Sequence, residues 1–244
     1  MSTIRFRDSS GYVRTGTLDG ETIQYGSSEI QRAEASILAP AQPSKIVCVG
    51  LNYADHAAEQ NEPIPDRPLL FLKPPNAVAH PHSEVTLPSG KDRIDYEAEL
   101  AVVIDKQAKE VPAEDALSYV RGFTCLDDLS NRDDQNREQN WIRGKAFDNA
   151  APMGPVLASP TAVPEDASIS LSVNGETRQH SSRDQFIFSI PELIEEITTY
   201  LTLEPGDVIS TGTPSGVGPV SDGDTISISI DGIGTLTHSV QIPD

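Results

Sequence analysis

Two glutamates, Glu97 and Glu99, lie in a run that otherwise reads as a buried strand, Asp95 to Ile104. Side chains at positions i and i+2 of a strand point to the same face, so the two carboxylates would project side by side. Such like charges are costly in an apolar setting unless a cation lies between them. A hard divalent cation meets that need, and carboxylate ligands favour magnesium, manganese or calcium over zinc. The alternative is an exposed edge strand, against which the apolar run of residues 101–104 argues.

A further pair of carboxylates, Asp127 and Asp128, follows a second apolar run, Phe123 to Leu126. If that run is the neighbouring strand, a carboxylate at its end could complete a three-oxygen metal site with Glu97 and Glu99. The spacing alone does not choose between the two aspartates.

A histidine and a glutamate, His56 and Glu59, stand three residues apart in a short stretch with helical character. On a helix the two side chains share a face. A carboxylate beside an imidazole fixes the tautomer of the ring and makes it a better general base. The alternative is an ordinary His–Glu pair on the surface of a short helix.

One lysine, Lys145, lies among aromatic and small residues in the run Trp141 to Phe147, in a chain with only six lysines. Near a metal site its ammonium group would stabilise developing negative charge. A structural salt bridge explains the same lysine equally well.

A loop rich in glycine and threonine, residues 210–218, follows an apolar strand-like run. Its backbone N–H groups and hydroxyls could hold a carboxylate. It lacks the lysine of a phosphate-binding P-loop, and a plain tight turn is the alternative.

The charge balance is strongly acidic, with 37 acidic against 18 basic residues and a net charge of −19. Acidic residues are spread along the chain, and lysine is scarce. This pattern fits a cytoplasm of very high salt, where screening weakens self-repulsion, so we expect a halophilic origin; an acidic mesophilic protein is the alternative. The same charge argues against nucleic-acid binding, which needs basic patches.

No stretch of 18 apolar residues is present, and the N-terminal residues lack the apolar core of a signal peptide. No membrane span is therefore expected. The two cysteines, Cys48 and Cys125, lie in apolar strand-like runs and are expected to be buried free thiols in a reducing cytoplasm.

The elements that would position these residues are mostly strands. Residues 1–43 predict a small N-terminal β unit, and residues 39–43 read as a linker to the main body, residues 44–244. In the main body Asn174-Gly175 predicts a hairpin turn, and Ser189 with Glu192 predicts a capping box that opens a helix. No βαβ alternation is present, so we expect a mixed α+β fold built around a β-sandwich or β-roll with few short helices.

Taken in order, seven segments resemble motifs of the fumarylacetoacetate hydrolase family, particularly its short acylpyruvase and oxaloacetate decarboxylase-like members. The resemblance covers about residues 44–240. The segments are residues 49–56, 71–74, 96–100, 126–133, 145–148, 188–191 and 206–214.

The resemblance implies a β-roll core, a homodimer and a magnesium or manganese site in which Asp128, not Asp127, is the third ligand. It also implies a dyad on a lid-like helix that activates water, and a lysine that stabilises charge. One departure is Leu51, where many short members carry an arginine that pairs with a substrate carboxylate. The implied site residues are Glu97, Glu99 and Asp128 for the metal, His56, Glu59 and Lys145 for catalysis, and Arg132, Gln135 and Thr213 for substrate contact.

The sequence therefore predicts a divalent-metal-dependent enzyme that cleaves a C–C bond of a small 2-oxo acid, by hydrolysis of an acylpyruvate. The metal would chelate the 2-oxo carboxylate and take up the enolate charge. The same stabilisation of an enolate by a metal ion serves three other reactions. They are decarboxylation of oxaloacetate, isomerisation of a 2-oxo diacid and dehydration of a 2-oxo-3-deoxy sugar acid. A non-catalytic β-scaffold or interaction protein is the alternative of a different class.

Overall fold

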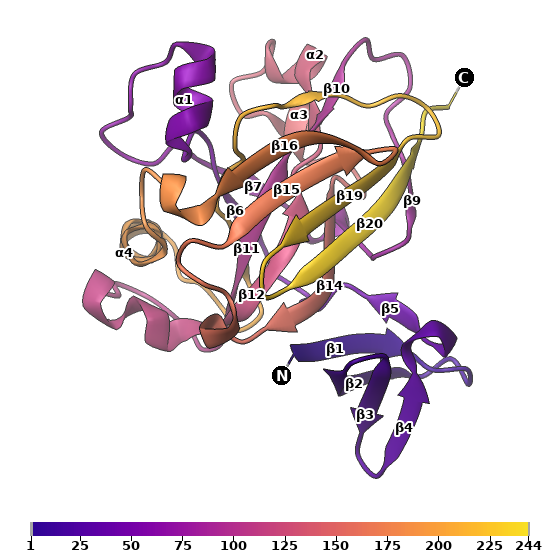
Figure 1. Cartoon of the computed structure of the whole chain (residues 1–244). Coiled ribbons are helices and arrows are strands. Elements are labelled where there is room, and N and C mark those ends of the chain that lie inside the picture. The colour runs from indigo at the N-terminus through magenta and orange to yellow at the C-terminus, as the bar shows by residue number, and fades with distance from the viewer. Residues whose placement is uncertain (1, 244) are drawn as a thin grey trace.

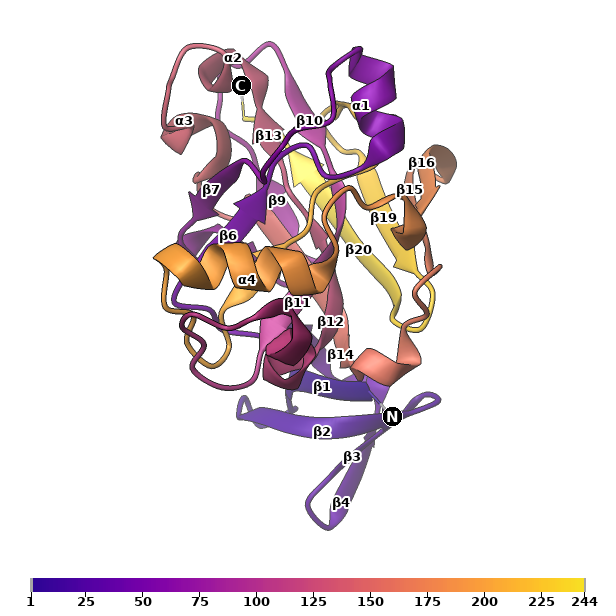
Figure 2. The same cartoon turned by 90° about the vertical axis from the view of Figure 1, so that its left-hand side faces the viewer.

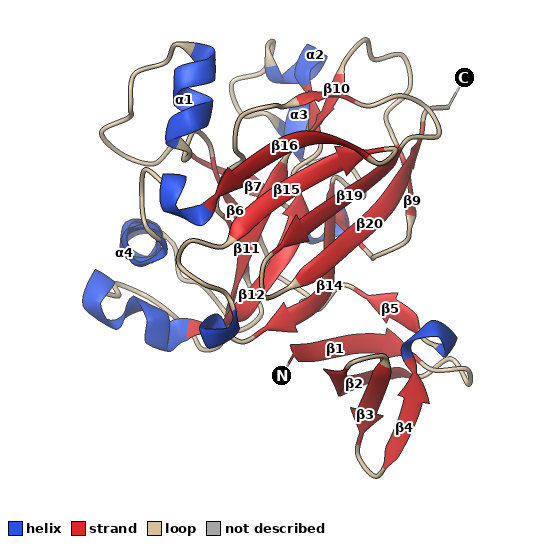
Figure 3. Cartoon of the chain, in the orientation of Figure 1, coloured by secondary structure: helices blue, strands red, loops and turns tan. Residues whose placement is uncertain are grey.

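The computed structural model describes residues 2–243, and strands make up most of it, with a few short helices between them (Figure 3). The predicted α+β class is thus confirmed. Two extended sheets face each other, as the views in Figures 1 and 2 show together. The functional residues predicted from sequence lie on short helices, strands and loops at one end of this sandwich.

The largest sheet has twelve strands and supplies most of the buried core. Two short strands lie off its main path, because β5 (Ser36–Leu38) pairs with β1 and β8 (Val78–Ala79) pairs with β14. The main path runs in the order β4 (Ser28–Gln31), β3 (Thr22–Tyr25), β2 (Val13–Asp19), β1 (Ser2–Arg7), β14 (Ala151–Ala158), β12 (Val120–Asp127), β11 (Ala98–Ile104), β17 (Val208–Ser210), β6 (Ile46–Val49) and β7 (Leu70–Lys73).

A five-stranded sheet lies in front of the large one in Figure 1. The order of its strands is β16 (Glu176–Ser182), β15 (Ser168–Val173), β19 (Thr225–Ile230), β20 (Gly234–Gln241) and β9 (Glu84–Thr86). The predicted hairpin turn joins β15 to β16, with Asn174 at φ 51° and Gly175 at φ 83°, as a two-residue turn of this kind requires. A third, small sheet has the order β13 (Ser130–Asn131), β10 (Ile94–Tyr96) and β18 (Gly218–Pro219).

Four α-helices connect the strands: α1 (Ala54–Gln60), α2 (Arg132–Gln135), α3 (Ile142–Lys145) and α4 (Ile190–Tyr200). The predicted capping box is present at α4, where Ser189 and Glu192 bond reciprocally. Helices α1, α2 and α3 lie at the same end of the sandwich in both views (Figures 1 and 2). Short 3₁₀ helices span Arg32–Glu34, Pro75–Ala77, Ala113–Tyr119, Pro160–Ala162 and Arg183–Gln185.

No helix within residues 2–243 has the length and apolar character needed to cross a membrane. Both cysteines are free and buried, as predicted. Burial raises the pKa of the Cys125 thiol to about 12, so this side chain keeps its proton.

The N-terminal strands β1 to β5 lie at the end opposite helices α1 to α3 (Figure 1). Strand β1 joins them to the main body, because Thr3 pairs with Leu157 of β14. The division into a unit of residues 1–43 and a catalytic domain of residues 44–244 stays a prediction.

Strand β14, in the middle of the large sheet, is not predicted by the sequence pattern. It contains Pro152 and Pro155, which cannot donate to a strand ladder and normally argue against a central strand. The structure accommodates them with an irregular register, since the pairing of β14 with β12 shifts between Phe123 and Cys125. All residues of β14 are buried, so the loss of ladder hydrogen bonds is offset by packing.

Candidate metal and substrate site

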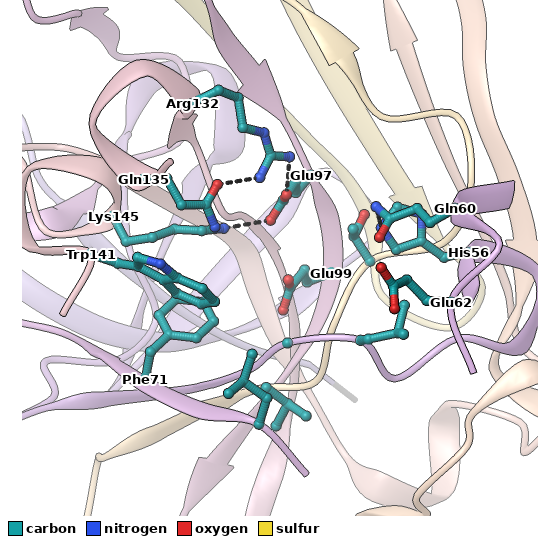
Figure 4. A pocket seen from close by; sticks show the side chains of 15 residues that line it. His56, Gln60, Glu62, Phe71, Glu97, Glu99, Arg132, Gln135, Trp141 and Lys145 are labelled. Carbon is teal, nitrogen blue, oxygen red and sulfur yellow. Dashed lines mark hydrogen bonds and ion pairs between the residues drawn. The ribbon is translucent and has the colours of Figure 1, made fainter. Parts of the chain in front are cut away.

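A cavity of about 290 Å³ is lined by residues of α1, α2 and α3, among others, and Figure 4 shows it from close by. Carboxylates and two cationic side chains line one part of it, and aliphatic and aromatic side chains line another. The lining residues that matter here are Leu51, His56, Gln60, Glu62, Leu69, Phe71, Glu97, Glu99, Arg132, Gln135, Trp141, Lys145 and Thr213.

Three buried carboxylates come together beside this cavity. Glu97 lies between β10 and β11, Glu99 lies on β11, and Asp128 directly follows β12. One oxygen of each lies within 4.8 Å of the others. Strand β11 is central, between β12 and β17, so the alternative of an exposed edge strand is wrong.

The neighbouring aspartate, Asp127, has a different place. Its Oδ1 accepts a hydrogen bond from the Glu97 backbone N–H at 2.8 Å, and its Oδ2 accepts one from Nε2 of His238 at 2.8 Å. His238 belongs to β20, so this contact connects the two sheets behind the carboxylates. The structure thereby places Asp128, and not Asp127, in the three-carboxylate cluster.

Cations surround the cluster. Lys145 Nζ lies 2.7 Å from Glu97 Oε2 and 2.7 Å from Asp128 Oδ2, and the Arg132 guanidinium also pairs with Glu97 (Figure 4). Burial opposes ionisation of Glu97, but Lys145 and Arg132 outweigh it and lower the pKa of this carboxyl to about 2. Lys145 therefore forms the salt bridges of the structural alternative, and it forms them at the predicted site.

Within residues 2–243, Glu99 forms no ion pair with a cationic side chain, unlike Glu97 and Asp128. The Ser210 hydroxyl and the Gly212 N–H donate to its Oε2, the latter at 2.8 Å. Burial, followed by the negative charges of Asp128 and Glu97, raises the pKa of Glu99 well above its usual range. A carboxylate in this position gains from an additional cation in the cluster.

A second buried lysine, Lys73 on β7, lies behind Asp128, with Nζ 2.7 Å from Asp128 Oδ1. Its ammonium group donates to the backbone oxygens of Leu129, Lys145 and Ala150, at 3.1, 2.6 and 2.9 Å. Its three protons are thus used, and Asp128 Oδ1 has no hydrogen-bond partner among residues 2–243. The contact is purely ionic, and the oxygen keeps its lone pairs for another partner.

This donor set fits a hard divalent cation. Three carboxylates converge, Asp128 Oδ1 pairs with the Lys73 ammonium but accepts no hydrogen bond within residues 2–243, and Glu99 is hard to ionise because of burial and its like-charged neighbours. Oxygen ligands of this kind suit magnesium, manganese or calcium. Glu97, Glu99 and Asp128 are the residues that would hold the ion.

The predicted His–Glu pair lies on α1, with His56 in the lining of the cavity and Glu59 beside it. His56 Nδ1 is 3.1 Å from Glu59 Oε2, and the His56 side chain is only 9% exposed. Because His56 lines the cavity, the alternative of a pair lying wholly on the surface does not hold. Glu59 itself is held by the Gly216 N–H, at 3.1 and 3.3 Å from its two oxygens.

The glycine- and threonine-rich loop thus binds carboxylates, as its composition indicates, but they are carboxylates of the protein. Gly212 N–H donates to Glu99, and Gly216 N–H donates to Glu59. Both glycines have positive φ, 94° and 93°. A Cβ at Gly216 would meet the Arg178 backbone oxygen at 2.2 Å, so the loop needs glycine there.

The three predicted substrate-contact residues also line the cavity. Arg132 Nη1 donates to Gln135 Oε1 at 2.6 Å, and Arg132 Nε donates to Asp95 Oδ2 at 2.8 Å. Thr213 Oγ1 accepts from Gln179 Nε2 at 2.9 Å. All nine predicted site residues are therefore at or beside one cavity, whereas Lys73, Asp95 and His238 were not predicted.

Residues 45–241 match the family described as Fumarylacetoacetate (FAA) hydrolase C-terminal. Oxaloacetate tautomerase FAHD2A, mitochondrial, of Bos taurus is 42% identical over 223 residues, which cover 86% of this chain and 71% of that relative. The structure of 5-carboxymethyl-2-hydroxymuconate delta-isomerase from Mycobacterium smegmatis is 37% identical, with a TM-score of 0.93 and 100% of each chain covered. The structure of fumarylpyruvate hydrolase from Pseudomonas aeruginosa in complex with Mn²⁺ and pyruvate is 38% identical, with a TM-score of 0.77, and covers 85% of this chain and 92% of that chain.

Proposed function

Because this chain belongs to the fumarylacetoacetate hydrolase family, we propose that it is a divalent-metal-dependent enzyme that hydrolyses a C–C bond of an acylpyruvate-type 2-oxo acid. The observation that carries the proposal is a single cavity that brings together a candidate metal site and a candidate general base. Three convergent carboxylates lie beside one part of it, and His56 of the His56–Glu59 dyad lines it.

Glu97, Glu99 and Asp128 would hold the cation, with magnesium or manganese as the preferred ion and calcium as an alternative. When bound, the ion supplies a Lewis acid that polarises the 2-oxo acid group and stabilises negative charge. A manganese ion is present in the complex of the Pseudomonas aeruginosa relative.

The protein's own residues would act on water and on charge. Glu59 accepts from His56 Nδ1–H, so Nε2 is the atom that takes a proton from water. The water oxygen attacks the distal carbonyl carbon, and the C–C bond to the pyruvate part breaks, yielding a carboxylic acid and pyruvate. The Lys145 ammonium, between Glu97 and Asp128, would stabilise the charge that develops there. Arg132, Gln135 and Thr213 would contact the substrate.

A second candidate is enolisation without water attack, as in tautomerisation, isomerisation or decarboxylation of a 2-oxo diacid. It is favoured by the bovine relative, which is named as an oxaloacetate tautomerase, and by the Mycobacterium smegmatis relative, which is named as an isomerase. This chemistry uses the carboxylate cluster and Lys145 but needs no nucleophilic water.

The test is a panel of acylpyruvates, oxaloacetate and 2-oxo-3-deoxy sugar acids, assayed with added magnesium or manganese. Turnover of acylpyruvates with release of pyruvate supports the hydrolase. Enol–keto exchange without cleavage supports the second candidate. No turnover of any member would support a non-catalytic scaffold instead.

A first prediction concerns Leu51, which lines the cavity where many short members of the family carry arginine. The two cations that line this cavity, Arg132 and Lys145, are already paired with carboxylates. We expect Leu51→Arg to supply a free guanidinium and to lower KM for an acylpyruvate with a carboxylate on its acyl tail. A matched neutral-tail acylpyruvate should gain nothing, and Leu51→Met serves as the size control. An equal change in KM for both substrates would contradict this role.

A second prediction follows from the net charge of −19. The Debye length falls from about 10 Å at 0.1 M salt to about 3 Å at 1 M, so repulsion among the carboxylates weakens. We therefore propose a halophilic, cytoplasmic protein whose melting temperature rises between dilute buffer and molar potassium chloride. Calorimetry at a series of salt concentrations measures this, and a constant melting temperature would reject the halophilic assignment.

The homodimer also remains a proposal. Strand β7 is at the edge of the large sheet, and Leu69, Leu72 and the nearby Ile142 are more than half exposed. These side chains would be covered by a second copy of the chain, which sedimentation analysis can detect.

A further inference from the structure

The last residue of α1, Gln60, contacts the imidazole that the proposed function uses as a base. Gln60 Nε2 lies 2.9 Å from His56 Nε2, whereas Glu59 contacts the other ring nitrogen, Nδ1. Figure 4 shows Gln60 beside His56. His56 and Gln60 are one helical turn apart, so the helix itself brings them together. Both side chains line the cavity.

The two contacts together determine where the ring proton lies. An ionised carboxylate can only accept, so Glu59 requires a proton on His56 Nδ1. His56 Nε2 then carries the lone pair, and the Gln60 amide N–H donates to it. Each neighbour thus favours the same neutral tautomer, in which Nε2 is unprotonated.

We propose that Gln60 is a positioning residue that holds His56 as the neutral Nδ1–H tautomer. Its amide N–H opposes a proton on Nε2 until water and substrate enter the cavity and take its place. The inference rests on the proposed function for its catalytic meaning, but the tautomer itself can be measured without any substrate.

The charges around the ring show why an amide is needed there. Glu59 and Glu62 face it from α1 and the following loop, and the buried carboxylates of Glu97 and Glu99 line the same cavity. Arg132 and Lys145 face it as cations but are paired with carboxylates. In this acidic setting a neutral amide contacts Nε2 through its N–H without adding another carboxylate beside the ring.

Two substitutions of similar size separate the hydrogen bond from simple packing. Gln60→Glu replaces the donor by an acceptor and favours Nε2–H, whereas Gln60→Met removes the hydrogen bond and leaves Glu59 to fix the tautomer. Gln241→Glu adds the same charge at the exposed end of β20 and serves as the control.

The first measurement is ¹⁵N NMR of histidine-labelled protein at neutral pH, with His56 assigned by its loss in His56→Ala. We expect Nδ1–H in the native chain, an added population of Nε2–H in Gln60→Met, where Glu59 alone favours Nδ1–H, and a protonated Nε2 in Gln60→Glu. An Nε2–H tautomer in the native chain, or unchanged ring signals in Gln60→Glu, would overturn the assignment whether or not any substrate is turned over.

The second measurement is acylpyruvate hydrolysis alongside enol–keto exchange, both at saturating magnesium. Gln60→Glu should lose hydrolysis by about 10²–10⁴-fold, the usual effect of losing a general base, with a much smaller loss of exchange. Gln60→Met should lose about tenfold, as for one neutral hydrogen bond. Equal loss of both reactions in Gln60→Glu would mean a merely structural role. Absence of hydrolysis in the native chain would reject the proposed function. The NMR measurement would then still test whether Gln60 holds the tautomer of His56.

Discussion

Glu97→Gln, Glu99→Gln and Asp128→Asn are each expected to weaken binding of a divalent cation sharply and to abolish turnover. Each change replaces a buried charged ligand by a neutral amide in a set of three, and the remaining two carboxylates cannot compensate. The structure adds a distinction among them. Because Glu99 is already hard to ionise, Glu99→Gln should change the free energy of unfolding of the metal-free protein little. The melting temperature of this variant should match the native value.

The measurement is manganese binding by electron paramagnetic resonance or titration calorimetry, together with activity and melting temperature. Asp105→Asn is a matched control, because Asp105 is exposed at the end of β11, the strand that carries Glu99. Full turnover by the native protein in excess chelator would reject the metal site.

Removal of the imidazole in His56→Ala is expected to reduce acylpyruvate hydrolysis by about 10²–10⁴-fold while metal binding survives. The reason is geometric, because His56 contacts Glu59 and Gln60 and, within residues 2–243, makes no hydrogen bond or ion pair with the three carboxylates. Any decarboxylation of oxaloacetate should fall less, since it needs an electron sink but no nucleophilic water.

Lys145→Ala is the contrast within the same experiment. Its ammonium group pairs with both Glu97 and Asp128, so both reactions should suffer. The rates of each variant on both substrates at saturating magnesium distinguish the two residues. Unchanged hydrolysis in His56→Ala would reject the dyad and, with it, the main reason to prefer a hydrolase.

Much of the site could be predicted because its signals are local. The spacing of Glu97 and Glu99 along a strand and of His56 and Glu59 along a helix determines which side chains share a face. Those two pairs needed no knowledge of the fold. Spacing could not choose Asp128 over Asp127, because adjacent residues differ mainly in the direction in which each side chain points; the family resemblance made that choice, and the carboxylate cluster contains Asp128.

The residues that were missed act through contacts between distant segments. Lys73 on β7 contacts Asp128, and His238 on β20 contacts Asp127. These residues are too far apart in the sequence for a local pattern to predict the contacts. A signal for Lys73 did exist: it ends an apolar run in a chain with few lysines. The sequence pattern also did not predict strand β14, because its two prolines normally argue against a central strand.

The contact between His238 and Asp127 has a consequence for the order in which the enzyme matures on the ribosome. Asp127 holds the Glu97 backbone, but the residue that holds Asp127 lies on β20, behind every other site-bearing segment in order of synthesis. A nascent chain that has exposed all three carboxylates still lacks the strand whose His238 holds Asp127, the acceptor of the Glu97 N–H. We therefore expect the proposed cation site to reach its final geometry only after β20 emerges.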